Sequence, residues 1–216
     1  MSLLTFEINY SRPLSVSYTK ELDGGGTNFG LEYIPILNSQ YPGRVFSKCY
    51  EWCSGPGFIG FGILSAGLCN TLCLSDIHQP AIDAVNNTIE QNQLDGIVTS
   101  YTTGDLALLP LTEQFDLVVS NPPHYVANRG YATKDEERIC VDADWESHKN
   151  FFAHIRKHLL PDGVILLQEN MKGSTVETFA PFIDAAGLKI TDWFKSPGYF
   201  STTGKAQIYY IELKHK

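Results

Sequence analysis

The stretch Asn121-Pro122-Pro123-His124-Tyr125 holds the residue types of this chain best suited to chemistry. It follows the apolar run from Phe115 to Ser120, which is typical of a buried parallel strand. Because consecutive prolines permit neither helix nor further ladder pairing, the chain is fixed just past the carboxyl end of that strand. Ligands bind at such strand ends in open α/β sheets. The Asn121 amide and the Pro122 carbonyl can together hold an amino group with both hydrogens engaged. The alternative is a plain strand-end turn, since Asn-Pro often initiates turns.

A glycine-rich turn lies further upstream. A strand is expected from Val45 to Trp52 and a helix from Phe58 to Ala66, with Gly67 as its C′ residue. Between them, Gly55, Gly57 and Gly60 fit the G-x-G-x-x-G spacing. That spacing allows a tight turn, an unobstructed backbone beside a ligand and close packing of helix on strand. The strand–turn–helix context makes this motif more informative than the glycines alone.

Aspartates follow the next two predicted strands. Asp76 ends the strand Thr71 to Ser75 and is placed to bind both hydroxyls of a ribose, or else to cap the following helix. Asp105 comes soon after the strand Ile97 to Thr102. It can accept a hydrogen bond from an exocyclic amine such as that of adenine, or cap a short turn. Spacing alone leaves both alternatives open for Asp105.

The remaining pattern alternates helices and strands and then ends on strands. Tyr125 to Trp145 has no clear period and is expected to be a long loop. The three histidines of the helix that follows, His148, His154 and His158, are expected to lie on its surface. The last two strands are joined by a connection too short for a crossover helix, so they must run antiparallel. The other expected elements are helices at Leu31–Asn38, Gln79–Gln91, Glu146–Leu160 and Thr175–Ala186, and strands at Leu4–Tyr10, Val164–Gln168, Leu188–Phe194 and Ala206–Leu213.

Composition narrows the class of protein. The chain has 216 residues, a formal net charge of −8 and a pI of about 5.2, which argues against a large phosphate-binding footprint. No signal peptide and no run of 18 apolar residues is present, so a cytoplasmic protein without a membrane span is expected. Four of the five cysteines, Cys49, Cys53, Cys69 and Cys73, form two C-x3-C pairs in strand and turn patterns, without C-x2-C spacing. Reduced structural thiols are therefore expected in place of a metal site.

From Val45 to its end, the chain resembles a class I S-adenosylmethionine-dependent methyltransferase of the Asn-Pro-Pro-Tyr type (HemK-like, small methyltransferase domain). The resemblance rests on Glu51-x-x-x-Gly55-x-Gly57, Asp76, Asp105 and Asn121-Pro122-Pro123, in that order. It implies a Rossmann-like α/β fold: a seven-stranded sheet between helical layers, with an antiparallel terminal strand. It also implies a methyltransferase domain at residues 45–216, preceded by an arm at residues 1–44 that covers the cofactor.

The same resemblance assigns roles to residues. Glu51, Cys53, Gly55 and Gly57 would hold the methionine part of S-adenosylmethionine, Asp76 and Ile77 its ribose, and Asp105 and Leu106 its adenine. Asn121, Pro122, His124 and Tyr125 would form the catalytic motif, with Asn121 also near the cofactor. The family usually has glycine in place of Cys53, and Tyr or Phe in place of His124. His124 could accept a proton or simply pack.

The expected function is therefore N-methylation of an amide or amino nitrogen, on a protein side chain or a small molecule. An adenine-N6 methyltransferase acting on RNA or DNA is an alternative, although the acidic charge disfavours it. The Gly55–Gly60 turn also fits an NAD(P)-dependent oxidoreductase, but the Asn-Pro-Pro stretch has no role in hydride transfer. Cys53 and His124 leave open a non-catalytic partner protein that retains the fold. The oligomeric state cannot be read from the sequence.

Overall fold

The computed structural model of the chain describes residues 2–127, 130, 134–197 and 207–216. Contacts divide the chain into two compact units, Met1–Gly104 and Asp105–Lys216. The domain boundary expected after residue 44 lies inside the first unit. No helix in the described ranges is long and apolar enough to cross a membrane.

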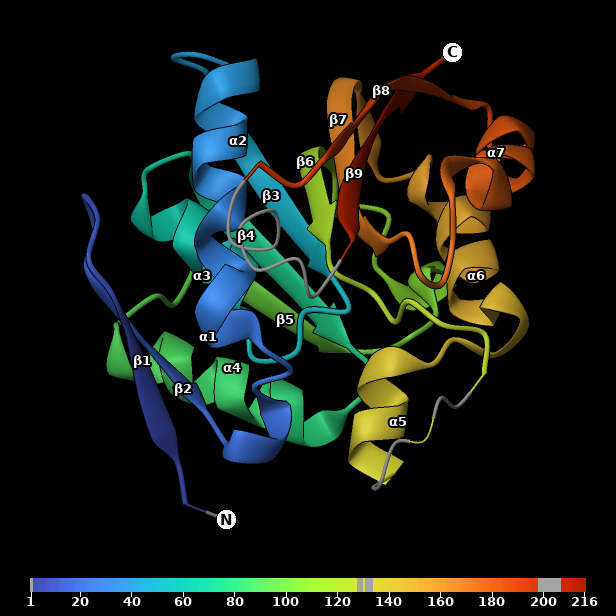
Figure 1. Ribbon diagram of the computed structural model, residues 1–216. Coiled ribbons are helices and arrows are strands. Elements are labelled where there is room, and N and C mark those ends of the chain that lie inside the picture. The colour runs from blue at the N-terminus through green and yellow to red at the C-terminus, as the bar shows by residue number, and fades with distance from the viewer. Residues whose placement is uncertain (1, 128–129, 131–133, 198–206) are drawn as a thin grey trace. The chain divides into compact units, whose positions relative to one another are not determined.

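The first unit contains a hairpin and a three-stranded parallel sheet segment (Figure 1). The central strands are almost continuously apolar in sequence because they are buried, as the 0% exposure of Tyr50, Leu72 and Leu74 shows. The strands are β1 (Leu4–Ile8), β2 (Leu14–Tyr18), β3 (Phe46–Trp52), β4 (Cys69–Asp76) and β5 (Val98–Thr102). The helices are α1 (Gly26–Phe29), α2 (Tyr33–Gln40), α3 (Phe58–Ser65) and α4 (Gln79–Gln91), with short 3-10 helices η1 (Lys20–Leu22) and η2 (Gly30–Glu32).

The β1–β2 hairpin packs against α4 (Figure 1). The backbone N–H of Ser17 donates to Thr88 Oγ1 at 2.9 Å, and that of Ser15 donates to Asn92 Oδ1 at 3.0 Å. These bonds satisfy donors on the strand edge that would otherwise be unpaired. The hairpin of the N-terminal arm is therefore fixed to α4 and its C-terminal end by specific hydrogen bonds.

The described part of the second unit contains four strands in the order β6-β7-β9-β8. β6 and β7 are parallel, whereas β9 is antiparallel to both β7 and β8. The strands are β6 (Phe115–Ser120), β7 (Leu159–Asn170), β8 (Leu188–Lys195) and β9 (Ile208–His215). The helices are α5 (Lys134–Cys140), α6 (Glu146–Ile155) and α7 (Val176–Ala185), with 3-10 helices η3 (Leu106–Leu108) and η4 (Ala143–Trp145). Helices α6 and α7 pack side by side (Figure 1).

Among the residues that the structure describes, the strand order is β5-β4-β3-β6-β7-β9-β8, a seven-stranded mixed sheet. The predicted α/β class and the predicted antiparallel pairing of the last two strands are confirmed. Part of the connection between those strands lies outside the described residues.

Three local predictions were wrong. The region expected to be a loop contains α5, whose run of charged residues hides any apolar stripe. Helix α6 ends at Ile155, five residues before the expected end at Leu160. Strand β7 begins at Leu159, five residues before the strand expected from Val164, and its register shifts between the pairs Phe115↔Leu159 and Leu117↔Val164.

The prediction of surface histidines on α6 was also wrong. His148 is 0% exposed and His158 1% exposed, while His154 is half-buried. His148 shares its helix face with Phe151, Phe152 and Ile155, which point into the core. Carboxylates within hydrogen-bond distance make a buried imidazole acceptable there.

Candidate active site

The glycine-rich turn of the first unit connects β3 to α3 with left-handed backbone. Gly55 has φ of 52° and Gly57 has φ of 87°, so both use the freedom of glycine. A Cβ added at Gly57 would lie 2.8 Å from the Phe61 ring, whereas one at Gly55 would meet nothing within 4 Å. Gly57 thus allows close helix packing, and Gly55 leaves space above the turn. Cys53 has φ of 53°, the conformation that a glycine at this position would adopt freely.

Asp76 stabilises this turn. Its Oδ2 accepts a hydrogen bond from the Gly55 N–H at 2.8 Å, and its Oδ1 accepts one from the His78 N–H at 2.8 Å. The predicted contact with a ribose stays a prediction, since a carboxylate can accept more bonds than these two. The next residue, Ile77, is 70% exposed and lies against Gly104. An exposed isoleucine beside a strand end offers an apolar surface on which a planar base could rest.

Glu51 is a buried acid beneath the same turn. Its Oε2 accepts a hydrogen bond from the Gly60 N–H at 2.7 Å, and the residue is 2% exposed. Burial raises the pKa of Glu51 to about 8, although the hydrogen bond from Gly60 opposes this rise. The carboxyl group is therefore mostly protonated at neutral pH.

Asp105, in the second unit, caps η3. Its Oδ1 accepts hydrogen bonds from the Ala107 N–H at 2.9 Å and from Asn150 Nδ2 at 2.8 Å. The bond from Asn150 is the main reason why the pKa of Asp105 is lowered. The Leu106 N–H donates to Asn150 Oδ1 at 3.0 Å, and the Leu106 side chain is buried. The capping role is thus seen directly, while contact of Asp105 and Leu106 with adenine stays a prediction.

Asn121 directly follows β6 and carries a buried acceptor without a partner. Its Oδ1 is shielded from solvent and accepts no hydrogen bond within the described part of the chain. Pro122, the next residue, is buried. A buried unpaired acceptor costs about 1–3 kcal/mol, so native proteins rarely retain one without a reason. An N–H donor on a ligand would satisfy it.

His124 and Tyr125 are held by the end of β7 and the segment beyond it. His124 Nδ1 lies 3.3 Å from Glu169 Oε2, and its side chain is 15% exposed. The Tyr125 hydroxyl accepts a hydrogen bond from Asn170 Nδ2 at 3.1 Å. A Cβ added at Gly173 would lie 1.9 Å from the His124 carbonyl oxygen. The motif backbone therefore passes Gly173 too closely for any side chain there.

A buried charged network continues from His124. His148 Nε2 lies 2.9 Å from Glu169 Oε1, and His148 Nδ1 lies 2.6 Å from Asp142 Oδ2. Burial alone would lower the pKa of His148, but the carboxylates of Glu169 and Asp142 outweigh it and raise this pKa to about 9. The same contacts hold the pKa of Glu169 and of Asp142 below their ordinary values, despite burial.

The prediction of site residues missed this network. A signal was available for Glu169, because it ends a strand parallel to β6, on the ligand side of the sheet. His148 could have been found from its spacing to Phe151, Phe152 and Ile155. Asp142 lies in the aperiodic region and carries no comparable signal.

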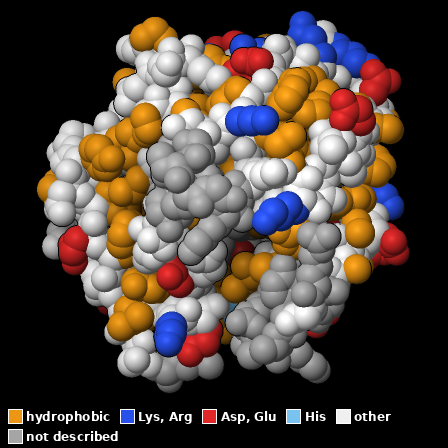
Figure 2. Space-filling view, in the orientation of Figure 1, with side chains coloured by type: hydrophobic (Ala, Val, Ile, Leu, Met, Phe, Trp, Pro, Cys, Tyr) orange, Lys and Arg blue, Asp and Glu red, His pale blue; other side chains and the backbone are white. Residues whose placement is uncertain are grey.

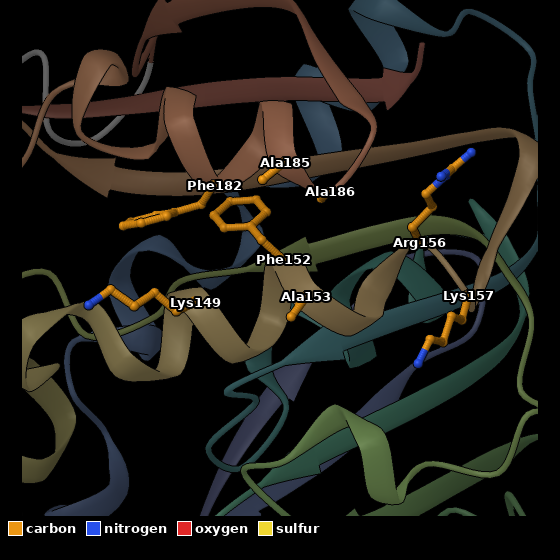
Figure 3. A pocket seen from close by; sticks show the side chains of 8 residues that line it. All are labelled: Lys149, Phe152, Ala153, Arg156, Lys157, Phe182, Ala185 and Ala186. Carbon is orange, nitrogen blue, oxygen red and sulfur yellow. The ribbon is translucent and has the colours of Figure 1, made fainter.

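A separate pocket of about 610 Å³ lies between α6 and α7 (Figure 3). Phe152 and Phe182 face each other across it, while Lys149 lies toward one end of α6 and Arg156 and Lys157 toward the other. Its lining residues are Lys149, Phe152, Ala153, Arg156, Lys157, Phe182, Ala185 and Ala186. None of the predicted site residues is among them, so this pocket is a second feature of the unit.

The predicted residues fall into two groups by unit. Glu51, Cys53, Gly55, Gly57, Asp76 and Ile77 belong to the first unit. Asp105, Leu106 and the motif Asn121 to Tyr125 belong to the second. The structure joins the first group through the Asp76–Gly55 bond and ties the motif to Glu169.

Known proteins resemble this chain in sequence and in fold. The ribosomal RNA small subunit methyltransferase C of Haemophilus influenzae strain PittGG is 23% identical over 204 residues, which are 94% of this chain and 50% of that protein. The enzyme of the same name from Actinobacillus pleuropneumoniae serotype 3 strain JL03 is 30% identical over 111 residues, 51% of this chain and 31% of that protein. The chain thus spans half or less of the length of these relatives.

The fold is shared with an S-adenosylmethionine-dependent methyltransferase from Clostridium acetobutylicum ATCC 824. The TM-score is 0.61 at 12% sequence identity, covering 86% of this chain and 91% of the other. The family model for the methyltransferase small domain matches residues 34–180, well over half of the chain. The chain therefore belongs to the methyltransferase small domain family, as its resemblance to S-adenosylmethionine-dependent methyltransferases implied.

Proposed function

We propose that this chain transfers the methyl group of S-adenosylmethionine to an amino nitrogen that Asn121 holds. The observation that carries the proposal is the buried Oδ1 of Asn121, which has no partner within the described residues. An amino group would satisfy this acceptor, and the carbonyl of Pro122 would accept its second hydrogen. The proline ring leaves no competing N–H at that position.

The residues of the first unit fit the cofactor. The open space at Gly55 leaves room for its methionine part, and exposed Ile77 offers an apolar surface to its nucleoside. Asp76 would bind the ribose, and Asp105 and Leu106 of the second unit would bind adenine. When bound, the cofactor supplies an electrophilic methyl group on a sulfonium that leaves as a neutral thioether.

The arm at residues 1–44 would cover the cofactor. Cβ atoms added at Gly26 and Gly30 would lie 2.3 Å and 2.8 Å from Phe58 side-chain atoms, so α1 and η2 pack closely on the first residue of α3. The arm therefore reaches the end of α3 that adjoins the glycine-rich turn. Cys53 and Glu51 complete the proposed methionine site from beneath.

In this mechanism the protein mainly positions the reactants. Asn121 and Pro122 would hold the nitrogen as it gains positive charge. The amide oxygen of Asn121 and the carbonyl oxygen of Pro122 would stabilise that charge in a partly buried site. Holding reactants in line is worth about 7–11 kcal/mol of the barrier. His124 and Tyr125 flank the motif, where His124 accepts the released proton or packs against the acceptor.

For the acceptor, we propose the exocyclic amine of an RNA base. Two features support this class: the relatives are named ribosomal RNA methyltransferases, and three cations line the α6–α7 pocket. A charge of −8 limits any phosphate contact to a local one. In Figure 2, Lys and Arg side chains gather at one corner of the face shown and elsewhere lie among acidic and apolar ones. The acidic charge also favours a second candidate, the side-chain amide of a protein.

Labelled methyl transfer tests the proposal. The chain is incubated with methyl-labelled S-adenosylmethionine and, separately, with ribosomal RNA, duplex DNA and total protein. Label in RNA supports the proposal, while label in protein alone would favour the second candidate, the side-chain amide of a protein. Binding of S-adenosylhomocysteine and of NAD is compared by thermal shift. Stabilisation by NAD alone would favour the oxidoreductase, and binding of S-adenosylhomocysteine without transfer to any acceptor would favour a non-catalytic partner protein.

A further inference from the structure

His124 stands where the family usually has Tyr or Phe, and the structure gives its Nδ1 a carboxylate partner. Its Nδ1 faces Glu169 Oε2 at 3.3 Å. Glu169 is 0% exposed and also lies 2.9 Å from His148 Nε2. The substitution in the motif thus connects the proposed acceptor site to a buried charged network.

The network places negative charge beside His124. Asp142 and Glu169 are ionised and His148 between them is protonated, which leaves one negative charge in excess. Tyr209 stays neutral, because burial and the charge of Glu169 raise the pKa of its hydroxyl, and Ser174 bridges it to Glu169. Tyr125 also lies beside His124, with ring centroids 6.4 Å apart.

The network also decides which nitrogen of His124 can act. An ionised carboxylate only accepts hydrogen bonds, so Glu169 selects the His124 tautomer with hydrogen on Nδ1. The lone pair of the neutral ring is then on Nε2. His148 in turn fixes Glu169, since it is buried between its two carboxylates and stacked on Phe179 at 4.6 Å.

We infer that Asp142, His148 and Glu169 are positioning residues that hold His124 as the proton acceptor of methyl transfer. This inference rests on the proposed function. The amine nitrogen attacks the methyl carbon, a C–N bond forms, and the S–C bond breaks with its electron pair going to sulfur. The methylated nitrogen, now cationic, loses a proton to His124 Nε2. The imidazolium is stabilised by Glu169 and later releases its proton to water.

The first test needs no acceptor. Two-bond ¹H–¹⁵N correlation spectra of the full chain report the tautomer of each histidine, and a His124→Asn variant identifies the His124 signals. We expect the neutral His124 ring to carry its hydrogen on Nδ1. In Glu169→Gln the amide can donate to Nδ1, so the hydrogen should move to Nε2. A His154→Gln control, on the same helix as His148, should leave the tautomer unchanged.

Hydrogen on Nε2 of His124 in the unmodified chain would overturn the inference. Because this result is read from the wild-type protein, it decides the matter even if Glu169→Gln fails to fold. The tautomer is independent of transfer, so finding no methylated acceptor would reject the proposed function and leave this assignment standing.

The second test is the pH dependence of turnover with the acceptor found by labelling. In the wild-type chain kcat should fall at low pH, because only a neutral imidazole can accept a proton. In His124→Gln this pH dependence should disappear and kcat should fall at least tenfold, while KM changes less than threefold. His148→Gln should lower kcat several-fold and move the low-pH limb, whereas His154→Gln should do neither. Identical pH profiles for the His148 variant and wild type would contradict the positioning role.

Discussion

At the scale of single residues, the candidate site is marked by polar groups that lack a hydrogen-bond partner or have a shifted pKa. Asn121 has a buried acceptor without a partner in the described chain, and Glu51 is an acid that burial keeps mostly neutral. Both groups carry a cost in the folded protein, the first through lost hydrogen bonding and the second through desolvation. Such costs concentrate at functional sites.

Asn121→Ala should separate binding from catalysis. The substitution removes the acceptor that the proposal places on the methylated nitrogen, and leaves the glycine-rich turn untouched. We expect kcat to fall about 10²–10³-fold, as when one preorganised polar group of an active site is removed. The affinity for S-adenosylhomocysteine, measured by calorimetry, should change less than threefold. A collapse of that affinity would show that Asn121 belongs to the cofactor site instead.

Glu51→Gln should change how stability depends on pH. The folded-state pKa of Glu51 is raised from 4.5 to about 8, so its favourable state is the protonated one. The contribution of Glu51 to the free energy of unfolding is complete below pH 4.5 and is lost as the pH rises toward 8. The wild-type chain should therefore lose up to about 1.4 kcal/mol per pH unit relative to Glu51→Gln across this window. Urea unfolding of both proteins at pH 5.5 and 7.5 measures the difference, and parallel curves would contradict it.

At the scale of elements, the motif depends on how the end of β6 meets the segment after β7. Gly173 lies against the motif backbone, since a Cβ there would approach the His124 carbonyl oxygen to 1.9 Å. That oxygen is backbone and cannot rotate away. The segment after β7 thus holds the motif by its shape as well as through Glu169.

Gly173→Ala should displace the motif without affecting the first unit. We expect kcat to fall at least tenfold and the free energy of unfolding to drop by about 1–3 kcal/mol, the usual cost of overpacking. Gly96→Ala gives a control, because a Cβ at Gly96 would meet nothing within 4 Å. Gly96 has φ of 77°, so its control variant also shows what backbone strain alone costs. Equal activity of the two variants would mean that Gly173 has no part in holding the motif.

The sequence predicted elements best where local signals agreed. Helix α4 begins and ends at the expected residues, Gln79 and Gln91, because Pro80 marks its start and an apolar stripe marks its length. Gly67 has the predicted left-handed conformation, with φ of 72°. Helix α5 was missed because its residues Lys134–Cys140 show no apolar stripe. The burial of His148 was missed because it depends on Asp142 and Glu169, which the fold brings together from distant positions.

At the scale of the whole molecule, the charge distribution bears on the acceptor. The chain carries a net charge of −8, yet Lys149, Arg156 and Lys157 line one pocket. The Lys149 ammonium lies 5.8 Å from the centre of the Phe182 ring, so the pocket combines positive charge with aromatic surface. Phe152 is buried, but Phe182 is only half-buried, so the cations suit phosphate contact and the accessible part of Phe182 suits base stacking.

Reversing charge in this pocket should weaken RNA binding. We expect Lys149→Glu with Arg156→Glu to lower RNA affinity at least tenfold and to reduce the dependence of affinity on salt. Both side chains are exposed, so stability should change by less than about 1 kcal/mol. Lys20→Glu with Lys195→Glu, also exposed, matches the change in net charge. Equal losses in both double variants, measured by fluorescence anisotropy at several salt concentrations, would mean that only net charge matters.

The most direct test of the account is to identify the atom that receives the methyl group. Ribosomal RNA treated with the chain and deuterated-methyl S-adenosylmethionine is digested to nucleosides and analysed by mass spectrometry. The account predicts a single nucleoside carrying the deuterated methyl on an exocyclic nitrogen, and its absence with Asn121→Ala. Methyl on carbon or on ribose oxygen, or equal labelling by Asn121→Ala, would contradict it.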